Sequence, residues 1–292
     1  GGTHRRWSRH VSCEVTGDTE SITLGHLEMG LSVLAGPLSA PRTRLVVVHP
    51  RYRLLNRSGL HLMYRSRGGH LGGMLVSHED GTAQLPFHWG ETPVAQRFLQ
   101  LAALGAHGPN GEEPSWCGAF AIDSPDGKSV ELVISIAVAG AGSETTPARQ
   151  FLQVSIEPVG PSLLVCFDMA HAAPYRLCND FAHAAFNFRQ LGTTLVHTVA
   201  PRASADYTWD DPMGPKVLRV TVGSAADGSA PPTPPGAEPS PFAPDEFEIR
   251  LAALREPTPH SATRGGPPTV WTTVQLGQST RLVRISPTAP LD

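Results

Sequence analysis

Hydrophobic residues along the chain gather in short runs of strand length and do not follow the three- to four-residue spacing of an amphipathic helix. Residues 217–222 alternate apolar and polar side chains, as a half-buried strand does. Similar runs are rich in Val, Ile and Leu and are separated by Gly, Pro, Asp and Ser: 44–48, 73–76, 130–138, 151–156, 163–167, 195–199 and 281–285. The pattern predicts an all-β fold.

Two stretches, 94–105 and 247–255, have the Ala, Leu, Arg and Gln or Glu content that favours helix locally. We nevertheless expect strands in both. Residues 247–251 alternate apolar and charged side chains, and the first stretch aligns with a strand later in the chain. Residues 223–245 are dense in Pro, Ala, Ser and Gly. Because such a composition cannot bury enough apolar surface, we expect a disordered Pro-rich loop there.

The sequence contains an internal repeat. Its first copy comprises residues 52–56, 62–65, 85–93 and 97–101, and its second comprises 175–179, 186–189, 205–212 and 216–220. A unit of roughly 120 residues has the size of a β-sandwich. We therefore predict two consecutive β-sandwich-like repeats, 20–160 and 161–292, with the boundary in the Pro- and Gly-containing stretch 158–161 and the insertion 223–245 in the second repeat.

Each copy has a strand that ends at an asparagine, Asn56 or Asn179. An Asn side chain can bond nearby backbone and so end or redirect a strand. We interpret both as repeat-defining and buried, the alternative being an amide that faces a bound partner. Six aromatic residues are predicted to pack in the core, and ligand stacking is the alternative for the three tryptophans among them: Tyr52, Phe87, Trp89, Trp116, Tyr207 and Trp209.

Charge and motif content argue against several functions. The net charge is −3 and the basic residues are dispersed, so we expect no nucleic-acid binding. The four cysteines form no CxxC pair and the 13 histidines lack ligand spacing, so we predict no metal and no cofactor. No apolar run is long enough to cross a bilayer. The chain opens without a methionine and is interpreted as an excerpt of a longer protein.

Catalytic signatures are also missing from the sequence, which has no GxSxG elbow, P-loop or GxGxxG. Asp210 and Asp211 are adjacent, and adjacent residues of a strand point to opposite faces, so they should not converge on one substrate. We therefore predict that the chain is not an enzyme.

Several of these segments resemble a known family. Residues 50–56, PRYRLLN, are similar to the strand that opens the adaptor-binding region of the vacuolar protein sorting-associated protein thirteen family, called the SHORT-ROOT-binding domain in the plant protein SHRUBBY. Residues 85–89, 116–123, 206–212 and 270–285 resemble other signatures of that region. The resemblance covers about residues 20 to 222.

The resemblance implies a fragment of a bridge-like lipid-transfer protein. Members of the family move lipids between organelles at membrane contact sites, and a string of β-repeats recruits them by binding short Pro-containing peptides of adaptor proteins. Each repeat carries an Asn at the position of Asn56 and Asn179. The expected partners are then adaptors and neighbouring repeats, and the expected location is cytoplasmic, peripheral at contact sites. The chain lacks the lipid-carrying groove and should transfer nothing alone.

The predicted function is therefore a non-catalytic protein-interaction module that docks an extended peptide, by strand addition at an exposed sheet edge. Two alternatives stay open. In the first, the repeats are architectural spacers with no ligand of their own; in the second, the chain is a carbohydrate-binding or hydrolytic β-sandwich. A lectin would place aromatic residues beside Asp or Asn on loops, and a hydrolase would gather carboxylates or histidines in a cleft.

Overall fold

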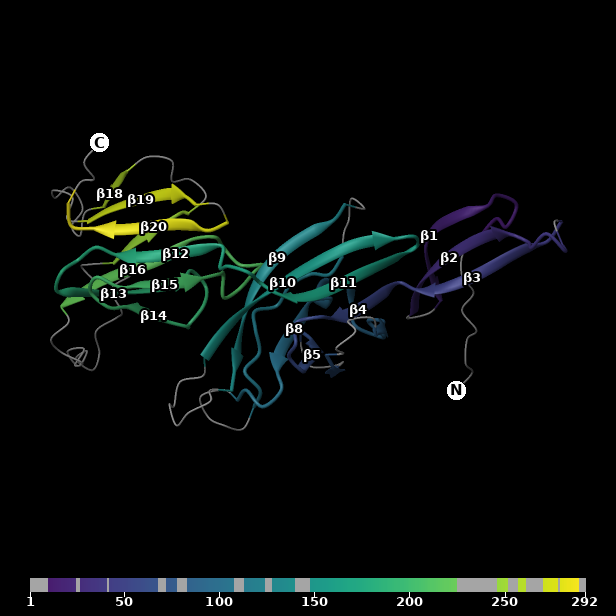
Figure 1. Ribbon diagram of the computed structural model, residues 1–292, viewed down its shortest axis with the longest axis horizontal. Helices are drawn as coiled ribbons and strands as arrows, with labels where there is room; N and C mark the ends of the chain where they lie inside the picture. The colour runs from purple at the N-terminus through teal and green to yellow at the C-terminus, as the bar shows by residue number, and fades with distance from the viewer. Residues whose placement is uncertain are drawn as a thin grey trace. The chain divides into compact units, whose positions relative to one another are not determined.

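The chain forms two compact units, Gly1–Ala170 and His171–Asp292, each built almost entirely of strands (Figure 1). This confirms the all-β prediction. The computed structural model describes residues 10–24, 27–40, 42–67, 72–77, 83–107, 113–123, 128–139, 148–224, 246–251, 257–260, 270–277 and 279–288.

Within its described residues, the first unit contains eleven strands and one short 3-10 helix, η1. In chain order these elements are β1 (Gly17–Leu24), β2 (Leu27–Ala35), β3 (Arg44–Pro50), β4 (Tyr52–Asn56), β5 (Leu62–Ser66), β6 (Gly72–Leu75), β7 (Gln84–Phe87), η1 (Val94–Gln96), β8 (Leu99–Ala103), β9 (Val130–Val138), β10 (Ala148–Val159) and β11 (Ser162–Met169).

Nine strands are present in the part of the second unit that the structure describes. They are β12 (Tyr175–Asn179), β13 (Ala184–Gln190), β14 (His197–Val199), β15 (Ser204–Tyr207), β16 (Leu218–Ser224), β17 (Glu246–Ile249), β18 (Thr258–His260), β19 (Val270–Leu276) and β20 (Arg281–Ser286).

Each unit has a five-stranded sheet of the same design, in the order β7-β4-β11-β10-β9 in the first and β15-β12-β20-β19-β18 in the second. In both, the second strand of this order pairs in parallel with the strand that comes last in its unit, β4 with β11 and β12 with β20. Its other neighbour, β7 or β15, is antiparallel. Figure 1 shows β10 and β11 as a long hairpin beside β9.

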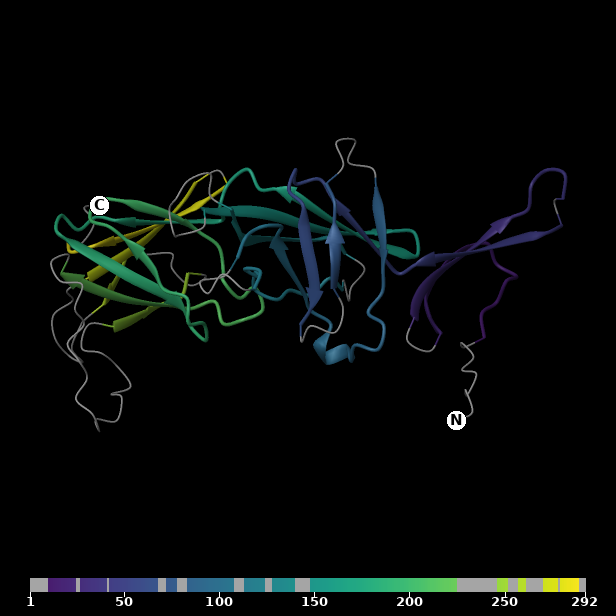
Figure 2. The ribbon, with the colours of Figure 1, turned by 90° about the horizontal axis from the view of Figure 1, so that it is seen from below.

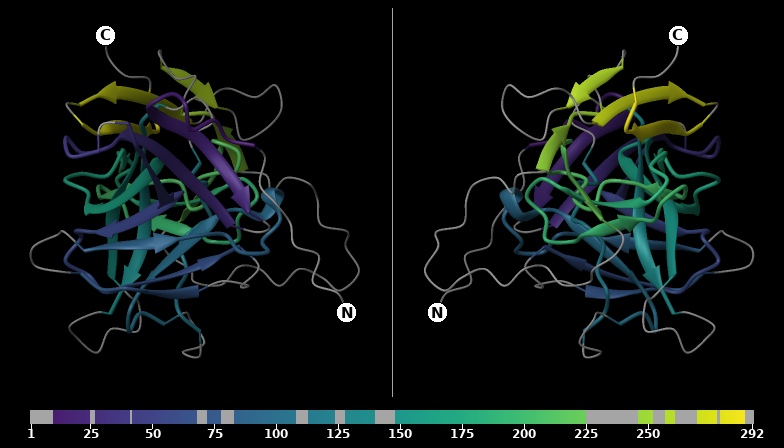
Figure 3. Two further views of the ribbon diagram at one scale, coloured as in Figure 1. Left: turned by 90° about the vertical axis from the view of Figure 1, so that its right-hand side faces the viewer. Right: turned by 90° about the vertical axis from the view of Figure 1, so that its left-hand side faces the viewer.

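A second sheet completes each sandwich, β6-β5-β8 in the first unit and β14-β13-β16-β17 in the second. The strands β19 and β20 of the second unit are the yellow strands of Figure 3. In the first unit, residues 115–120 take the place that β17 has in the second. Leu99 of β8 and Phe120 exchange two backbone hydrogen bonds, of 2.8 and 2.9 Å.

The pairing register confirms that the units are repeats of one design. Tyr52 lies opposite Phe87, and Tyr175 lies opposite Tyr207. Asn56 lies opposite Phe167 of β11, as Asn179 lies opposite Ile285 of β20. A hydrogen bond from a side-chain hydroxyl to the backbone also repeats. The hydroxyl of Ser162 donates to the backbone oxygen of Pro50 (2.8 Å), and that of Thr280 donates to the backbone oxygen of Ala173 (2.7 Å).

The boundary between the units differs from the one predicted at 158–161. Val159 and Ser162 are paired across a tight hairpin turn, in which Gly160 has φ +58°. A Gly-Pro sequence that suggests a linker is equally suited to a tight turn. β11 then pairs with β4, so the first unit runs on to Ala170.

Each sandwich has its own hydrophobic core. In the first unit the core includes Leu54, Leu101, Phe120, Leu152 and Val165, and in the second it includes Leu177, Phe186, Leu218, Val220 and Val283. Because strands alternate their side chains, each sheet places every second residue between the two layers.

A third sheet of the first unit, β1-β2-β3, has a small core of Ile22, Leu31 and Val33 (the purple to blue strands of Figure 2). β2 lies very close to the first sandwich at Gly30, where a Cβ atom would come within 2.5 Å of the Cβ and backbone oxygen of Pro161.

The two stretches with helix propensity contain strands, although shorter than expected. Residues 94–96 form η1, and the strand β8 begins only at Leu99. In the second stretch β17 ends at Ile249. Of the predicted disordered insertion 223–245, residues 223 and 224 close β16, and the remainder lies outside the described residues.

Candidate interaction surfaces

Asn56 is buried at the end of β4, and its side chain is fully used by its own repeat. The amide nitrogen Nδ2 donates to the backbone oxygens of Leu60 (2.7 Å) and Leu75 (3.0 Å). The oxygen Oδ1 accepts from the backbone N–H of Ser58 (3.2 Å) and from its hydroxyl (2.7 Å). This Asn therefore ties the end of β4 to the turn that follows and to β6.

Asn179 repeats this arrangement at the end of β12. Its Nδ2 lies 2.9 Å from the backbone oxygen of Ala184 and 3.0 Å from those of Val199 and Ala200, while Oδ1 accepts from the N–H of Phe181 at 3.0 Å. The two asparagines are 3 % and 2 % exposed. Neither amide is therefore presented to a partner at the surface, and both serve backbone groups that would otherwise be unsatisfied.

The predicted core aromatic residues gather around β4 in the first unit and around β12 in the second. Tyr52, Phe87 and Trp89 are buried and pack edge to face, with ring centroids 5.0 to 6.1 Å apart. Tyr207 and Trp209 are buried in the second unit, and their ring centroids lie 5.7 Å apart. Edge-to-face contacts of this kind add stability beyond the area they bury.

Trp116 differs from the other aromatic residues and corrects the expectation of a core position. It is only half-buried, and the guanidinium carbon of Arg65 lies 4.2 Å from the centre of its ring. Arg65 in turn donates from Nε to Oε1 of Gln100 (3.1 Å). Trp116 therefore covers an arginine on the outer face of the sheet β6-β5-β8. A cation over an indole face is a favourable contact, and burial lowers the pKa of Arg65.

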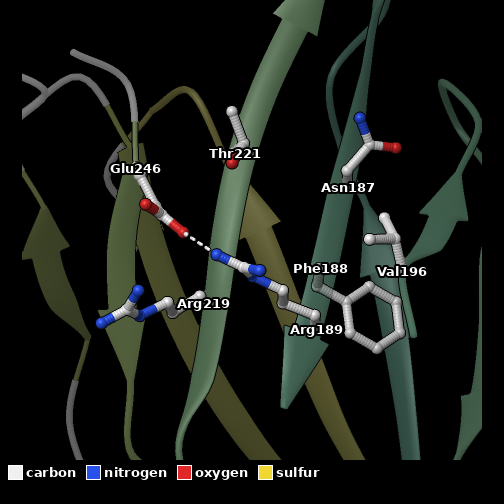
Figure 4. Close-up of a pocket in the computed structure, with 7 residues that line it drawn as sticks. All are labelled: Asn187, Phe188, Arg189, Val196, Arg219, Thr221 and Glu246. Atoms are coloured by element: carbon white, nitrogen blue, oxygen red, sulfur yellow. Dashed lines mark ion pairs between the residues drawn. The ribbon is translucent and has the colours of Figure 1, made fainter. Parts of the chain in front are cut away.

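A groove with a volume of about 290 Å³ lies on the corresponding face of the second unit (Figure 4). It runs across β14, β13, β16 and β17, and it is lined by Asn187, Phe188, Arg189, Val196, Arg219, Thr221 and Glu246. A guanidinium nitrogen of Arg189 lies 3.6 Å from Glu246. Nε of Arg219 donates to Glu248 at 3.2 Å. Two arginines thus point onto one open surface, and each has a carboxylate partner.

The strand β3 presents an apolar open edge. In the described part of the chain it pairs with β2 alone, as the last strand of its sheet. Its side chains Leu45, Val46 and Val48 are 54 %, 41 % and 53 % exposed. Exposed apolar edge strands are templates for pairing with another chain, and proteins normally cover or charge them. This edge is therefore a candidate docking site.

A polar junction joins the sheet of β3 to the first sandwich. The phenol of Tyr52 donates a hydrogen bond to Asp123 and lies 3.2 Å from Oε2 of Glu28, which is on β2. Glu28 also forms an ion pair with Arg97. Burial, together with the neighbouring carboxylates, raises the pKa of Tyr52 well above its ordinary value. The phenol therefore stays neutral and acts as a structural donor.

One polar pair was not foreseen from the sequence. His197 and Asp210 are 13 residues apart, yet Nε2 of His197 lies 2.9 Å from Oδ2 of Asp210, whose side chain is buried. The imidazole stacks on Phe188 with ring centroids 4.9 Å apart. Asp211 points elsewhere, because its Oδ1 accepts from the N–H of Met213 at 2.9 Å. The two adjacent aspartates thus do not converge, and no spacing motif would have identified the His–Asp pair.

Two general features can be stated for the part of the chain that the structure describes. No group of three or more His, Cys, Asp and Glu side chains is placed to hold a metal ion. No helix among these residues is long and apolar enough to cross a membrane.

Comparison with known proteins places this arrangement in context. Residues 3–216 match the family model described as "Vacuolar-sorting associated protein 13, adaptor binding domain". The chain is also similar to a protein of Dictyostelium discoideum described as "Intermembrane lipid transfer protein vps13D", with 24% identity over 193 residues. The aligned part is 66% of this chain and 4% of that protein, so the chain spans only a small fraction of the length of this relative.

Proposed function

The chain belongs to the vacuolar-sorting associated protein 13 family, through its adaptor-binding domain, and we propose that it holds adaptor proteins by pairing an extended segment of the adaptor with the open edge of β3. It is a non-catalytic interaction module. The observation that supports this site is the exposed apolar strand β3, which has a paired neighbour on one side only in the described part of the chain.

The geometry of an added strand suits a Pro-containing ligand. In a strand, successive backbone N–H groups point alternately to the two sides, so a peptide at an edge uses only every second N–H for pairing. Proline has no N–H and is tolerated where that group would face solvent. Prolines two residues apart, as in Pro-x-Pro, can therefore both occupy outward-facing positions without loss of a hydrogen bond to β3.

Side chains on β3 supply affinity for such a segment. Val46 and Val48 are two residues apart and share one face, while Leu45 lies on the other. Each Val is about half exposed. Covering both is worth about 2 kcal/mol, since complete burial of a Val side chain is worth roughly 1.5 kcal/mol or more. We propose that Asn56 and Asn179 define the repeats and contribute to binding only by holding the framework.

A second candidate function is that of an architectural spacer, and one observation favours it. The last strand of each unit, β11 or β20, pairs in parallel with the strand that ends at Asn56 or Asn179. The open edge of β3 can pair in the same way with the strand of a neighbouring repeat that ends at such an asparagine. In that case β3 would join repeats end to end and would have no adaptor ligand.

Titration of two peptides tests these functions. The first carries Pro-Ser-Pro in a polar background, and the second copies residues 172–182 around β12. We expect the folded chain to bind the first peptide, and V46K/V48K to weaken that binding by roughly thirtyfold, the equivalent of about 2 kcal/mol. Val94, 72 % exposed and outside the sheets, provides the control V94K. Binding of the second peptide alone would overturn the adaptor function and support the spacer.

For the protein as a whole we propose peripheral attachment to organelle membranes through these adaptors, at contact sites where lipid is exchanged. The described relative is named an intermembrane lipid transfer protein. A fluorescent fusion of the chain should collect on organelle membranes in cells, and V46K/V48K should leave it diffuse in the cytoplasm. Equal membrane recruitment of both forms would contradict docking at β3.

A further inference from the structure

The outer faces of the two repeats carry an arginine at the same place. Arg65 of β5 lies opposite Gln100 of β8, and Arg189 of β13 lies opposite Arg219 of β16. The register aligns these pairs, because the next residues, Ser66 and Gln190, lie opposite Leu99 and Leu218. The two faces can therefore be compared residue by residue.

The segment next to this row differs between the repeats, and in the second repeat the residue paired with Arg219 is Glu248, two residues from Glu246. In the first, the segment 115–120 follows β8 and places the indole of Trp116 over Arg65, 4.2 Å from ring centre to guanidinium carbon. In the second, β17 follows β16 and places Glu246 beside Arg189 at 3.6 Å. A carboxylate thus stands in the second repeat where the first has a large aromatic ring, and the groove of about 290 Å³ is found in the second repeat.

Glu246 leaves the flat face of the Arg189 guanidinium available. Glu246 and Glu248 interact with nitrogen atoms at the edges of Arg189 and Arg219, as Figure 4 shows for the first pair. A guanidinium can bond a carboxylate in its plane and stack an aromatic ring on its face. Within the described residues, no aromatic ring lies over Arg189, whose side chain is 41 % exposed.

We propose that this groove binds an aromatic side chain of a partner protein, stacked on Arg189 as Trp116 is stacked on Arg65. An acidic group is a poorer occupant, because each arginine already has a carboxylate partner and the local charges balance. The size of the groove agrees, since pockets for drug-sized ligands begin at roughly 300 Å³ and this one suits a single side chain. Val196 adds an apolar wall beside the ring.

The site is distinct from the edge of β3, so the inference does not depend on the proposed function. It predicts a preference for partners that carry Trp, Tyr or Phe in a segment that reaches the sheet β14-β13-β16-β17.

Nuclear magnetic resonance titration of the full chain with N-acetyl-tryptophanamide tests the proposal, with N-acetyl-alaninamide and N-acetyl-aspartate amide as controls. We expect saturable shifts, in the millimolar range, of the Arg189 Nε–H and of the amides of Asn187 and Thr221 with the indole compound only. R189K retains the charge next to Glu246 but lacks the flat face. It should weaken binding by roughly two- to thirtyfold, the range between an exposed and a desolvated cation–π contact.

The reciprocal variant W116A uncovers Arg65 in the first repeat. It should gain a second set of shifts, at Arg65 and Gln100, while the response at Arg189 is unchanged. The proposal is overturned if the alanine compound shifts the same signals, if the aspartate compound binds more strongly, or if R189K responds as the wild type does. Failure of these titrations with intact peptide binding at β3 would refute the aromatic site alone.

Discussion

Removal of the Asn179 side chain should destabilise the second unit more than any surface substitution. The variant N179A leaves the backbone oxygens of Ala184 and Val199 and the N–H of Phe181 without their partners. The contact with Val199 is buried, and those with Ala184 and Phe181 are partly buried. The substitution leaves the aromatic core unchanged, so it tests the hydrogen bonds themselves.

The expected loss follows from the number of bonds. The amide nitrogen of Asn179 has two hydrogens for three nearby oxygens, and its Oδ1 accepts one bond, so three hydrogen bonds are lost. At about 1 kcal/mol for each, the free energy of unfolding should fall by about 3 kcal/mol. For a unit of this size that corresponds to a decrease in Tm of roughly 10 °C. N56A should have a similar effect on the first unit.

Urea unfolding followed by hydrogen–deuterium exchange of peptides from each unit measures this loss, because it separates the two units. N187A is the matched control. Asn187 is exposed on β13 and accepts a bond from the hydroxyl of Thr198 (2.7 Å), so its loss should cost no more than about 0.5 kcal/mol. If N179A is as stable as N187A, the asparagine does not anchor the repeat and the reasoning is wrong.

Three further outcomes follow from the first unit. G30A should destabilise it by about 1–3 kcal/mol and increase exchange in β2, because a Cβ would collide with Pro161; unchanged exchange would refute the close contact. Burial raises the pKa of the Cys117 thiol to about 12, so at pH 8 it should resist iodoacetamide while the exposed Cys13 reacts. Equal labelling of both would contradict this. The raised pKa of Tyr52 means that the folded state favours the neutral phenol. Stability should therefore fall as pH rises above about 10 in the wild type but less in Y52F, as pH-dependent urea unfolding would show.

The repeat was predictable from sequence because its signals are local and occur twice. Alignment of Asn56 with Asn179 placed Leu99 in register with Leu218, and the structure pairs these two leucines with equivalent residues, Ser66 and Gln190. When a weak pattern occurs twice at the same spacing, each copy limits how the other can be interpreted. The comparison of the two copies therefore also favoured a strand over a helix at β8. Identification of the family rested on the same segments.

Features that depend on contacts distant in sequence were not predictable in the same way. The turn at Gly160 can be told from a linker only once β11 is known to return to β4. The position of Trp116 on the surface depends on Arg65, which is 51 residues earlier and belongs to another strand. The open edge of β3 is likewise a property of the sheet order, whereas the sequence shows only an apolar run.

The comparison of the two repeats explains how one framework can present different surfaces. The asparagine of each opening strand satisfies several main-chain groups, so a change there affects the turn and its neighbouring strand together. The outer row that contains Arg65 or Arg189 lies beside Trp116 in the first repeat and beside Glu246 in the second, where β17 adds a strand to the sheet. Replacement of a ring by a carboxylate there changes what the sheet offers to a partner and leaves the sandwich intact. A repeat of this design can therefore acquire a binding preference in one copy while the other copy remains closed by its own tryptophan.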